Sequence, residues 1–120
     1  MNFRFHICRW GYKNLADIKK VVQRTIDAGI PYDYQWADID YMDQHDDFTV
    51  DDKNFAGMKE FIEELHTKDM RFGIILDPGM PENLPENEYP PFTEALKAKI
   101  LIRYANGDLA TGKGVKINDN

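Results

Sequence analysis

Short apolar runs alternate with longer amphipathic segments along this chain, and this alternation constrains the fold more than any other feature. Residues 3–8 alternate in polarity with period two, and residues 32–37 and 72–76 form apolar runs. Between these runs, residues 14–29 and 55–68 carry apolar side chains at helical spacing. The order predicts a β-α-β-α-β arrangement, in which right-handed crossovers place the strands in parallel. We therefore expect an α/β fold.

Both predicted helices have a recognisable apolar face. Asn14 favours the N-cap of the first helix, Asp17 complements the dipole of its first turn, and Gly29 is expected to cap its C-terminus. The apolar stripe of this helix consists of Leu15, Ile18, Val22 and Ile26. The stripe of the second helix consists of Phe55, Met58, Ile62 and Leu65. The continuous apolar run that follows, residues 72–76, is typical of a strand buried on both faces.

The second predicted strand, residues 32–37, ends abruptly in carboxylates. In a regular strand, alternate residues from Tyr32 to Asp38 point to one face, which leads two phenol rings and an indole up to one carboxylate. Parallel-sheet proteins present polar groups to ligands at such strand ends. Asp38 is therefore a candidate binding residue. The alternative is an acidic loop that only keeps the domain soluble.

Two parallel α/β folds fit the pattern, an eight-stranded barrel and a doubly wound sheet. Residues 9–12, which follow the first strand, are not a Gly-rich phosphate loop, and this disfavours the dinucleotide-binding form of the doubly wound sheet. In a barrel, function is carried by the loops at the C-terminal ends of the strands. Candidate groups follow all three predicted strands: Trp10, then Asp38 with Ile39 and Asp40, then Asp77 with Met80.

The last third of the chain departs from this alternation. Prolines recur between residues 78 and 91, and they predict a long loop that is neither a helix nor a central strand. Residues 100–104 are strand-like, and Asn106-Gly107 is typical of a type I′ turn that leads into residues 108–110. We expect a small hairpin outside the main sheet.

Composition indicates one globular domain and excludes several partners. The chain has 120 residues, of which 42% are hydrophobic and 30% charged. A formal net charge of −6 argues against nucleic acid and anionic membranes, since both bind clustered Lys and Arg. No apolar stretch has the length of a membrane-spanning segment. Cys8 is the only cysteine, which excludes an internal disulfide and predicts a buried structural thiol.

Two segments resemble known ligand-binding motifs, but each lacks a residue that its motif requires. Residues 107–113 match most of a P-loop, but Gly114 stands where a Ser or Thr must bind magnesium. The aspartates from Asp38 onward suggest a calcium loop, yet Asp43 takes the glycine position and Thr49 the glutamate position. His45 is interpreted as a solvated loop residue rather than a metal ligand. We predict no metal site.

Four segments together resemble family 31 of the glycoside hydrolases: residues 6–12, 31–43, 47–49 and 74–78. They look like the opening of the catalytic barrel in the α-glucosidases of that family, and the resemblance covers roughly residues 3–112. It implies a (β/α)₈ TIM barrel of which this chain supplies about the first three βα units, with an inserted loop and hairpin. It also implies hydrolysis of terminal α-linked glucose with retention, through an aspartate nucleophile and a separate aspartic acid/base, and without a cofactor.

The resemblance implies substrate-binding roles for a few residues. Asp38 matches the aspartate that hydrogen-bonds hydroxyls of the terminal glucose, and Ile39 matches its apolar neighbour in the pocket. Trp10 matches an aromatic wall, while Met80 matches an aliphatic residue, commonly isoleucine, of the same subsite. Gly79-Met80 departs from the Ala-Ile that is usual there. These roles suit the residue types, because a carboxylate accepts hydroxyl hydrogens and apolar walls cover the faces of a sugar ring.

The groups that would perform the chemistry are not predicted in this chain. The nucleophile motif of the family, Trp-x-Asp-Met-Asn, does not occur, and residues 112–117 lack the tryptophan that normally follows the hairpin. A retaining glycosidase needs two carboxyl groups about 5 to 5.5 Å apart, and the resemblance gives neither role to Asp38, Asp40 or Asp77. Because a barrel takes about 250 residues, we expect residues 1–120 to be an N-terminal fragment of a catalytic barrel, with strand and helix units over about 3–76 and the excursion over about 77–112.

Two hypotheses of different classes follow. In the first, the chain is part of an α-glucosidase that acts on an α-glucoside or oligosaccharide, and its partner is the remainder of the barrel. In the second, it is a truncated noncatalytic protein that binds carbohydrate or another partner. A reading frame that continues beyond Asn120 into the nucleophile motif distinguishes the two. Family members are lysosomal, in the endoplasmic reticulum, at the cell surface, secreted or in the bacterial cytoplasm, so the resemblance predicts no single compartment.

Overall fold

The computed structural model describes residues 5–82 and 84–112. It divides into two compact units, Met1–Asp77 and Pro78–Asn120, and each is described by itself. Three parts of the sequence-based predictions lie outside the described residues: the start of the first strand, at Phe3 and Arg4, the glycine that breaks the P-loop pattern, Gly114, and the segment 113–117 that lacks the expected tryptophan.

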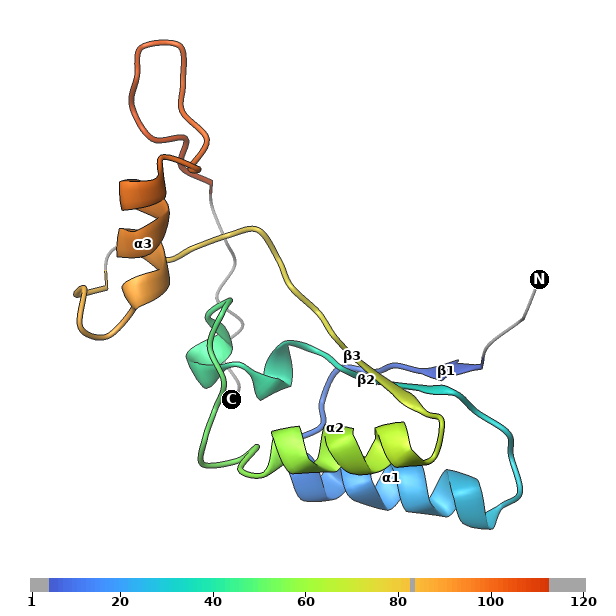
Figure 1. Cartoon of the computed structure of the whole chain (residues 1–120). Helices are drawn as coiled ribbons and strands as arrows, with labels where there is room; N and C mark the ends of the chain where they lie inside the picture. The colour runs from blue at the N-terminus through green and yellow to red at the C-terminus, as the bar shows by residue number, and fades with distance from the viewer. Residues whose placement is uncertain (1–4, 83, 113–120) are drawn as a thin grey trace. The chain divides into compact units, whose positions relative to one another are not determined.

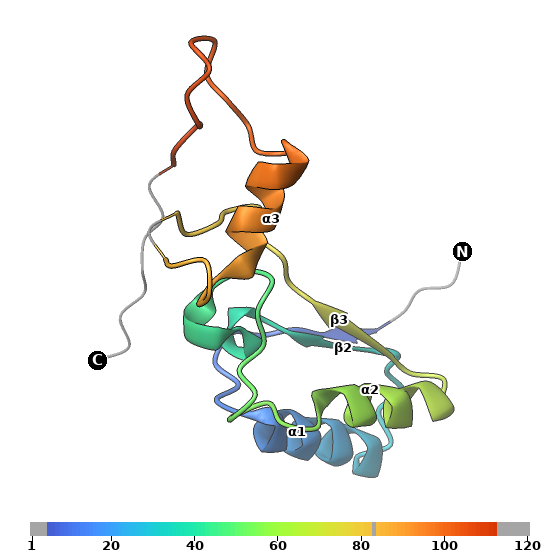
Figure 2. The same ribbon diagram turned by 60° about the vertical axis from the view of Figure 1, so that its left-hand side comes forward.

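The first unit is a parallel sheet with two helices on one side (Figure 1). Its strands are β1 (His6–Ile7), β2 (Tyr34–Ala37) and β3 (Arg71–Ile74), in the order β1-β2-β3. Both pairings are parallel, and Tyr34 of β2 pairs with His6 on one side and with Arg71 on the other. Figures 1 and 2 show α1 (Leu15–Asp27) and α2 (Met58–Thr67) together on the same face of the sheet. The predicted α/β class and the β-α-β-α-β order are confirmed.

Helix α1 begins and ends at the predicted signals. The side chain of Asn14 accepts a hydrogen bond from the backbone N–H of Asp17 at 2.9 Å. At the other end, Gly29 has φ +67° and its N–H donates to the carbonyl of Ile26, while the N–H of Ile30 donates to the carbonyl of Thr25. This is the Schellman arrangement, in which a residue with a left-handed backbone follows the C-cap.

The apolar stripe of α1 differs from the prediction at its last member. Ile26 is 38% exposed, and Thr25 is buried in its place. With 3.6 residues per turn, positions 25 and 26 lie on either side of Val22 when the helix is viewed along its axis. The core lies on the side of Thr25, whose hydroxyl donates to the carbonyl of Val21 at 2.8 Å and so enters the core with its polar group satisfied.

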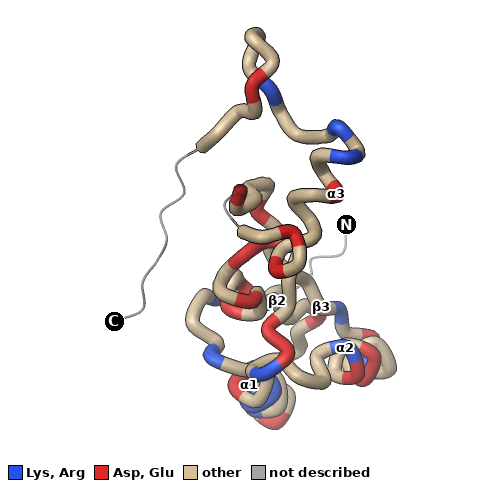
Figure 3. Tube along the Cα trace, turned by 90° about the vertical axis from the view of Figure 1, so that its left-hand side faces the viewer, with Lys and Arg blue, Asp and Glu red and all other residues tan. Residues whose placement is uncertain are grey.

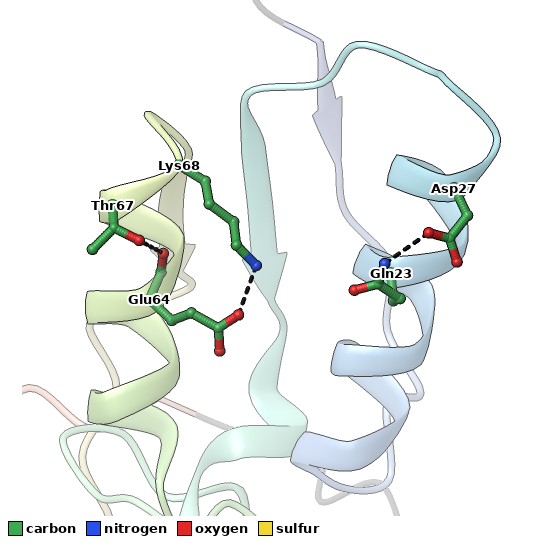
Figure 4. A network of polar contacts seen from close by, with 5 residues as sticks. All are labelled: Gln23, Asp27, Glu64, Thr67 and Lys68. Atoms are coloured by element: carbon green, nitrogen blue, oxygen red, sulfur yellow. Dashed lines mark hydrogen bonds and ion pairs between the residues drawn. The ribbon is translucent and has the colours of Figure 1, made fainter.

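Packing between the helices and the sheet forms the core. Phe61 of α2 meets Phe72 of β3 edge to face, with ring centroids 6.3 Å apart, and Lys19 of α1 places its ammonium group 5.2 Å from the centroid of the Phe61 ring. On the exposed sides, Gln23 donates to Asp27 within α1, and Lys68, the C-cap of α2, donates to Glu64 of α2 (Figure 4). Such exposed pairs contribute a few tenths of a kcal/mol each, so burial of apolar area dominates. The other buried apolar residues of the core are Tyr12, Leu15, Ile18, Val22, Tyr32, Ala37, Tyr41, Met42, Phe55, Leu65 and Met70.

The face of the sheet opposite the helices carries a stacked aromatic row. Rings of His6 and Tyr34 stack at 4.7 Å, rings of Tyr34 and Trp36 stack at 5.2 Å, and the indole N–H of Trp36 donates to Nδ1 of His6 at 3.1 Å. The indole of Trp36 covers Gly73 of β3, where a Cβ atom would lie 2.6 Å from the ring. The prediction that Tyr32 shares this face is wrong, because Tyr32 precedes β2 and is buried in the core.

All three strands are shorter than predicted, and two burial predictions are wrong. Residues 72–76 are not buried on both faces, since Ile74 is 40% and Leu76 is 53% exposed. Cys8 is exposed rather than buried. Both errors have one physical reason: a sheet of three short strands leaves its edge strands and the residues just beyond them uncovered.

The second unit contains a helix where the sequence predicted only a loop. Helix α3 (Pro90–Ala98) begins with its two prolines in the first turn. A proline is tolerated there because the first N–H groups of a helix have no partner within the helix. The prediction that the prolines exclude a helix is therefore wrong for residues 90–98.

The predicted hairpin is present in the second unit, but its turn differs in type. Arg103 and Leu109 form an antiparallel bridge, and the N–H of Tyr104 donates to the carbonyl of Asp108 at 2.8 Å. Gly107 has φ +92°, whereas Asn106 is not in the left-handed region. A type I′ turn needs both residues there, so the connection is instead a three-residue loop with a glycine at the bulge position.

Among the described residues, no helix combines the length and the apolar character needed to cross a bilayer.

Candidate functional site

The loop after β2 begins with the carboxylate that the sequence singled out. Oδ1 of Asp38 accepts a hydrogen bond from the N–H of Ile39 at 2.8 Å and thereby caps a short 3₁₀ helix, η1 (Ile39–Tyr41). The side chain of Asp38 is partly buried, and Ile39 packs against the core. The carboxylate thus stands at the C-terminal end of a parallel strand, on a backbone held by the core beneath it. Such strand ends are where parallel α/β proteins bind ligands.

Asp40 joins this loop to the loop after β1. Its Oδ2 accepts a hydrogen bond from the N–H of Gly11 at 2.9 Å. Gly11 has φ +101°, a conformation that residues with a Cβ adopt only with strain. The preceding residue, Trp10, is 50% exposed, and its carbonyl accepts from Nε of Arg9 at 3.3 Å. The hydrogen bond from Gly11 to Asp40 joins the loop that carries Trp10 to the loop that begins with Asp38, so both residues lie at the same edge of the sheet.

Two further contacts join the loop to the end of β3. The hydroxyl of Tyr41 donates to the carbonyl of Ile75 at 2.9 Å, and Oδ1 of Asp47 accepts from the N–H of Asp77 at 2.8 Å. Burial raises the pKa of Asp47, an effect that the hydrogen bond from Asp77 opposes. Burial also raises the pKa of Tyr41, assisted by the charges of Asp47 and Asp77. The loop after β2 is therefore fixed to both neighbouring strand ends.

The middle of this loop is closed on itself. Oγ1 of Thr49 accepts from the N–H of Asp43 at 2.9 Å and donates to the carbonyl of Asp46 at 2.6 Å. Within this segment Gln44 and Phe48 have positive φ angles of 51° and 65°. Acidic residues recur along the loop in Figure 3. Among the described residues, however, no group of three or more His, Cys, Asp or Glu side chains is arranged to hold a metal ion.

The structure brings three of the four predicted site residues together in the first unit: Trp10, Asp38 and Ile39. Met80 belongs to the second unit. A shallow, largely apolar depression of about 520 Å³ also lies on the first unit. It is lined by residues that lie between the end of a helix and the start of the next strand, such as Ile30 and Met70. It is therefore separate from Asp38.

Sequence reasoning missed the residues that hold the loop in place. Asp40 was grouped with Asp38 only as a candidate group, and Tyr41 and Asp47 were given no role. Their partners lie 29, 34 and 30 positions away in the chain. The sequence offers one signal, Gly11, because a glycine just after a predicted strand indicates a backbone turn.

Comparison with known proteins identifies the family. The model for the Glycosyl hydrolases family 31 TIM-barrel domain matches residues 1–119. Lysosomal α-glucosidase of Rattus norvegicus is 37% identical over 109 residues, which are 91% of this chain and 11% of that protein. α-Glucosidase of Hordeum vulgare is 38% identical over 104 residues, 85% of this chain and 12% of that protein. Intestinal sucrase-isomaltase of Suncus murinus is 35% identical over 102 residues, 85% of this chain and 6% of that protein.

Solved structures give the same result. The crystal structure of the endoplasmic-reticulum glucosidase II complex, a catalytic subunit with the binding domain of its regulatory subunit, matches with a TM-score of 0.79 and 27% identity over 89% of this chain and 11% of that chain. The α subunit of glucosidase II bound to Glc1Man2 matches with a TM-score of 0.78 and 28% identity over 88% of this chain and 11% of that chain. The chain thus spans about a tenth of the length of several relatives that it matches. The family match covers nearly the whole chain, and the chain belongs to family 31 of the glycosyl hydrolases.

Proposed function

We propose that this chain supplies part of the sugar-binding pocket of a retaining α-glucosidase. In this proposal Asp38 accepts hydrogen bonds from hydroxyls of the terminal glucose, and Trp10 and Ile39 cover apolar parts of the ring. The chain itself provides no catalytic residue. The nucleophile and the acid/base belong to other segments of a (β/α)₈ barrel, of which residues 1–120 form the N-terminal part.

The observation that carries the proposal is the placement of Asp38. Its carboxylate stands at the C-terminal end of β2, and among the described residues it accepts a hydrogen bond only from the N–H of Ile39, within its own loop. A carboxylate accepts several hydrogen bonds, so acceptor capacity remains for hydroxyl groups. Through Asp40 and Gly11, the same loop is joined to the loop that presents Trp10, an exposed aromatic ring. A carboxylate and an exposed aromatic ring on two joined loops can recognise a sugar together, because they pair hydroxyl acceptors with an apolar surface.

Relatives support an α-linked glucose as the substrate group. The matched proteins include α-glucosidases of animals and plants, and glucosidase II has been crystallised with a glucose disaccharide, alpha3-Glc2. We therefore propose an α-glucoside or an oligosaccharide that ends in glucose as the substrate of the complete protein. In that protein the remainder of the barrel would cover the aromatic row of His6, Tyr34 and Trp36, which lies on the face of the sheet opposite the helices.

The test is the substitution Asp38→Asn in the complete protein that carries this segment, assayed with maltose. Asn keeps the shape but loses the charge, and hydrogen bonds to a charged group are worth about 1.5 to 3 kcal/mol. At about 1.4 kcal/mol per tenfold, kcat/KM should fall by about ten- to a hundredfold. Part of the loss should appear in kcat, because sugar hydroxyl contacts strengthen in the transition state.

Asp46→Asn is the matched control, since it removes the same charge from the same loop at a residue with no predicted contact to the sugar. Its kcat/KM should stay within about twofold of the parent, because surface substitutions away from a site have small effects. A parent protein that hydrolyses maltose while Asp38→Asn leaves kcat/KM within twofold would contradict the proposed site. A complete protein that binds maltose without hydrolysing it would instead support the noncatalytic carbohydrate-binding alternative.

A further inference from the structure

We infer that Asp40 is a positioning residue, which holds Trp10 at a set place relative to Asp38 and so determines how tightly the pocket binds its sugar. The inference rests on the proposed function, because it assigns a role within that pocket. Asp40 itself contacts no sugar in the proposed pocket and acts through the backbone of the loop after β1.

The two aspartates of η1 use their carboxylates differently. Asp38 accepts from the N–H of the next residue, so its hydrogen bond is local. Asp40 accepts from the N–H of Gly11, 29 positions earlier, so its hydrogen bond joins two loops. Among the described residues Asp40 makes no ion pair. The long-range bond to Gly11 is thus the interaction that explains a partly buried carboxylate at this position.

The loop after β1 depends on this bond for its shape. Strand β1 has only two residues, and Trp10 lies three residues beyond its end. The N–H of Gly11 is directed at Asp40 while the backbone of Gly11 takes a φ of +101°. The indole of Trp10 makes no ring-stacking contact with any described residue. The backbone around Trp10 is held by the bond from Gly11 to Asp40 and by the side chain of Arg9, which donates to the carbonyls of Trp10 and Gly11 at 3.3 and 3.5 Å. Of these bonds, the one to Asp40 joins this loop to the loop that carries Asp38.

Displacement of Trp10 is expected to change KM more than kcat. A wall that covers the face of a sugar ring contacts the ground state and the transition state alike, and loss of such uniform binding raises KM while kcat changes little. Displacing Trp10 should have this effect. A residue that only stabilises the fold would lower the amount of active enzyme and leave KM unchanged.

The test is a double-mutant cycle in the complete protein with maltose as substrate. Asp40→Ala removes the acceptor, and Trp10→Ala removes the wall. We expect Asp40→Ala to raise KM by about tenfold, in line with the worth of a hydrogen bond to a charged group. The same substitution in the Trp10→Ala background should raise KM by less than about twofold, because residues that act through one contact are not additive. Asp40→Asn retains an acceptor oxygen and should recover most of the KM. Asp43→Ala, an exposed aspartate of the same loop, is the control and should leave KM unchanged.

A second measurement reads the contact itself. In the complete protein labelled with ¹⁵N-glycine, the amide proton of Gly11 should move upfield and exchange faster with solvent in Asp40→Ala, but not in Asp43→Ala. Equal KM effects of Asp40→Ala with and without Trp10, or an unchanged Gly11 amide, would overturn the inference while the pocket stands. If Trp10→Ala alone leaves KM unchanged, the proposed pocket fails instead, whatever the amide shows.

Discussion

At the scale of single residues, two buried tyrosines show that a hydroxyl group can contribute differently to stability. The hydroxyl of Tyr41 donates to the carbonyl of Ile75, whereas the hydroxyl of Tyr32 is buried and has no hydrogen-bond partner among the described residues. Burial, and secondarily the nearby Tyr12, raises the pKa of Tyr32 to about 12. The hydroxyl of Tyr41 connects the loop after β2 to the end of β3. The hydroxyl of Tyr32 loses its hydrogen bonds to water on folding and gains no protein partner among the described residues.

Removing each hydroxyl should therefore have a different effect on stability. Tyr41→Phe should lower the free energy of unfolding by about 1 to 2 kcal/mol, because it also leaves the carbonyl of Ile75 without its partner. Tyr32→Phe should leave this free energy unchanged or raise it by up to about 1 kcal/mol, because no protein hydrogen bond is lost. Urea unfolding of the 120-residue chain and the two variants measures both values. An equal loss in the two variants would contradict this reading of the hydroxyls.

The carboxylate of Asp51 links stability to pH. It accepts from the backbone N–H groups of Lys53 and Asn54 and from the side chain of Asn54, and these bonds, with the Asn54 backbone bond first, lower its pKa. A carboxyl group with a lower pKa in the folded state stabilises the fold above its unfolded pKa, and this contribution is lost as the pH falls through the folded pKa.

Two substitutions of Asp51 separate its charge from its role as a hydrogen-bond acceptor in the turn. At pH 7, Asp51→Ala should lower the free energy of unfolding by about 1 kcal/mol, because the N–H groups of Lys53 and Asn54 lose their acceptor. Its difference from the parent should shrink as the pH falls below the usual pKa of aspartate, about 3.9. Asp51→Asn retains an acceptor and should lose less at pH 7. A difference between the parent and Asp51→Ala that is constant from pH 7 to pH 3 would contradict the pKa assignment.

At the scale of elements, the packing of β2 on β3 depends on a glycine. The indole of Trp36 lies where the Cβ of a residue at position 73 would be, and the same indole bonds His6 and stacks on Tyr34. Gly73→Ala should therefore displace the ring and cost about 1 to 3 kcal/mol, the usual range for overpacking. Gly79→Ala, whose added Cβ meets nothing within 4 Å, is the control and should stay within about 0.5 kcal/mol. Urea unfolding monitored by tryptophan fluorescence measures both, and a neutral Gly73→Ala would contradict the close approach.

Local signals predicted the elements, and long-range contacts limited the rest. Helix α1 was predictable because Asn14 and Gly29 satisfy its ends through bonds to near neighbours. Helix α3 was missed because proline favours a first helical turn as much as a loop, and the sequence alone does not distinguish them. The stripe of α1 shifted to Thr25 because only the tertiary core decides between adjacent positions.

At the scale of the whole molecule, the same distinction holds for the site. Parallel strands bring their C-terminal ends to one edge, so the order of elements alone predicted that Trp10 and Asp38 belong together. The bonds that hold these loops, from Gly11 to Asp40 and from Asp77 to Asp47, join residues about 30 positions apart and follow from no local pattern. Composition and periodicity therefore predict where a site forms, and tertiary contacts determine its shape.

In the proposed pocket, Asp38 binds the terminal glucose of the substrate. The most direct measurement is a crystal structure of the complete protein soaked with glucose. We expect a glucose hydroxyl oxygen within about 3 Å of a carboxylate oxygen of Asp38, the range of a hydrogen bond, with the indole of Trp10 against the sugar. Glucose bound in the barrel with no hydroxyl within hydrogen-bond distance of Asp38 would contradict it.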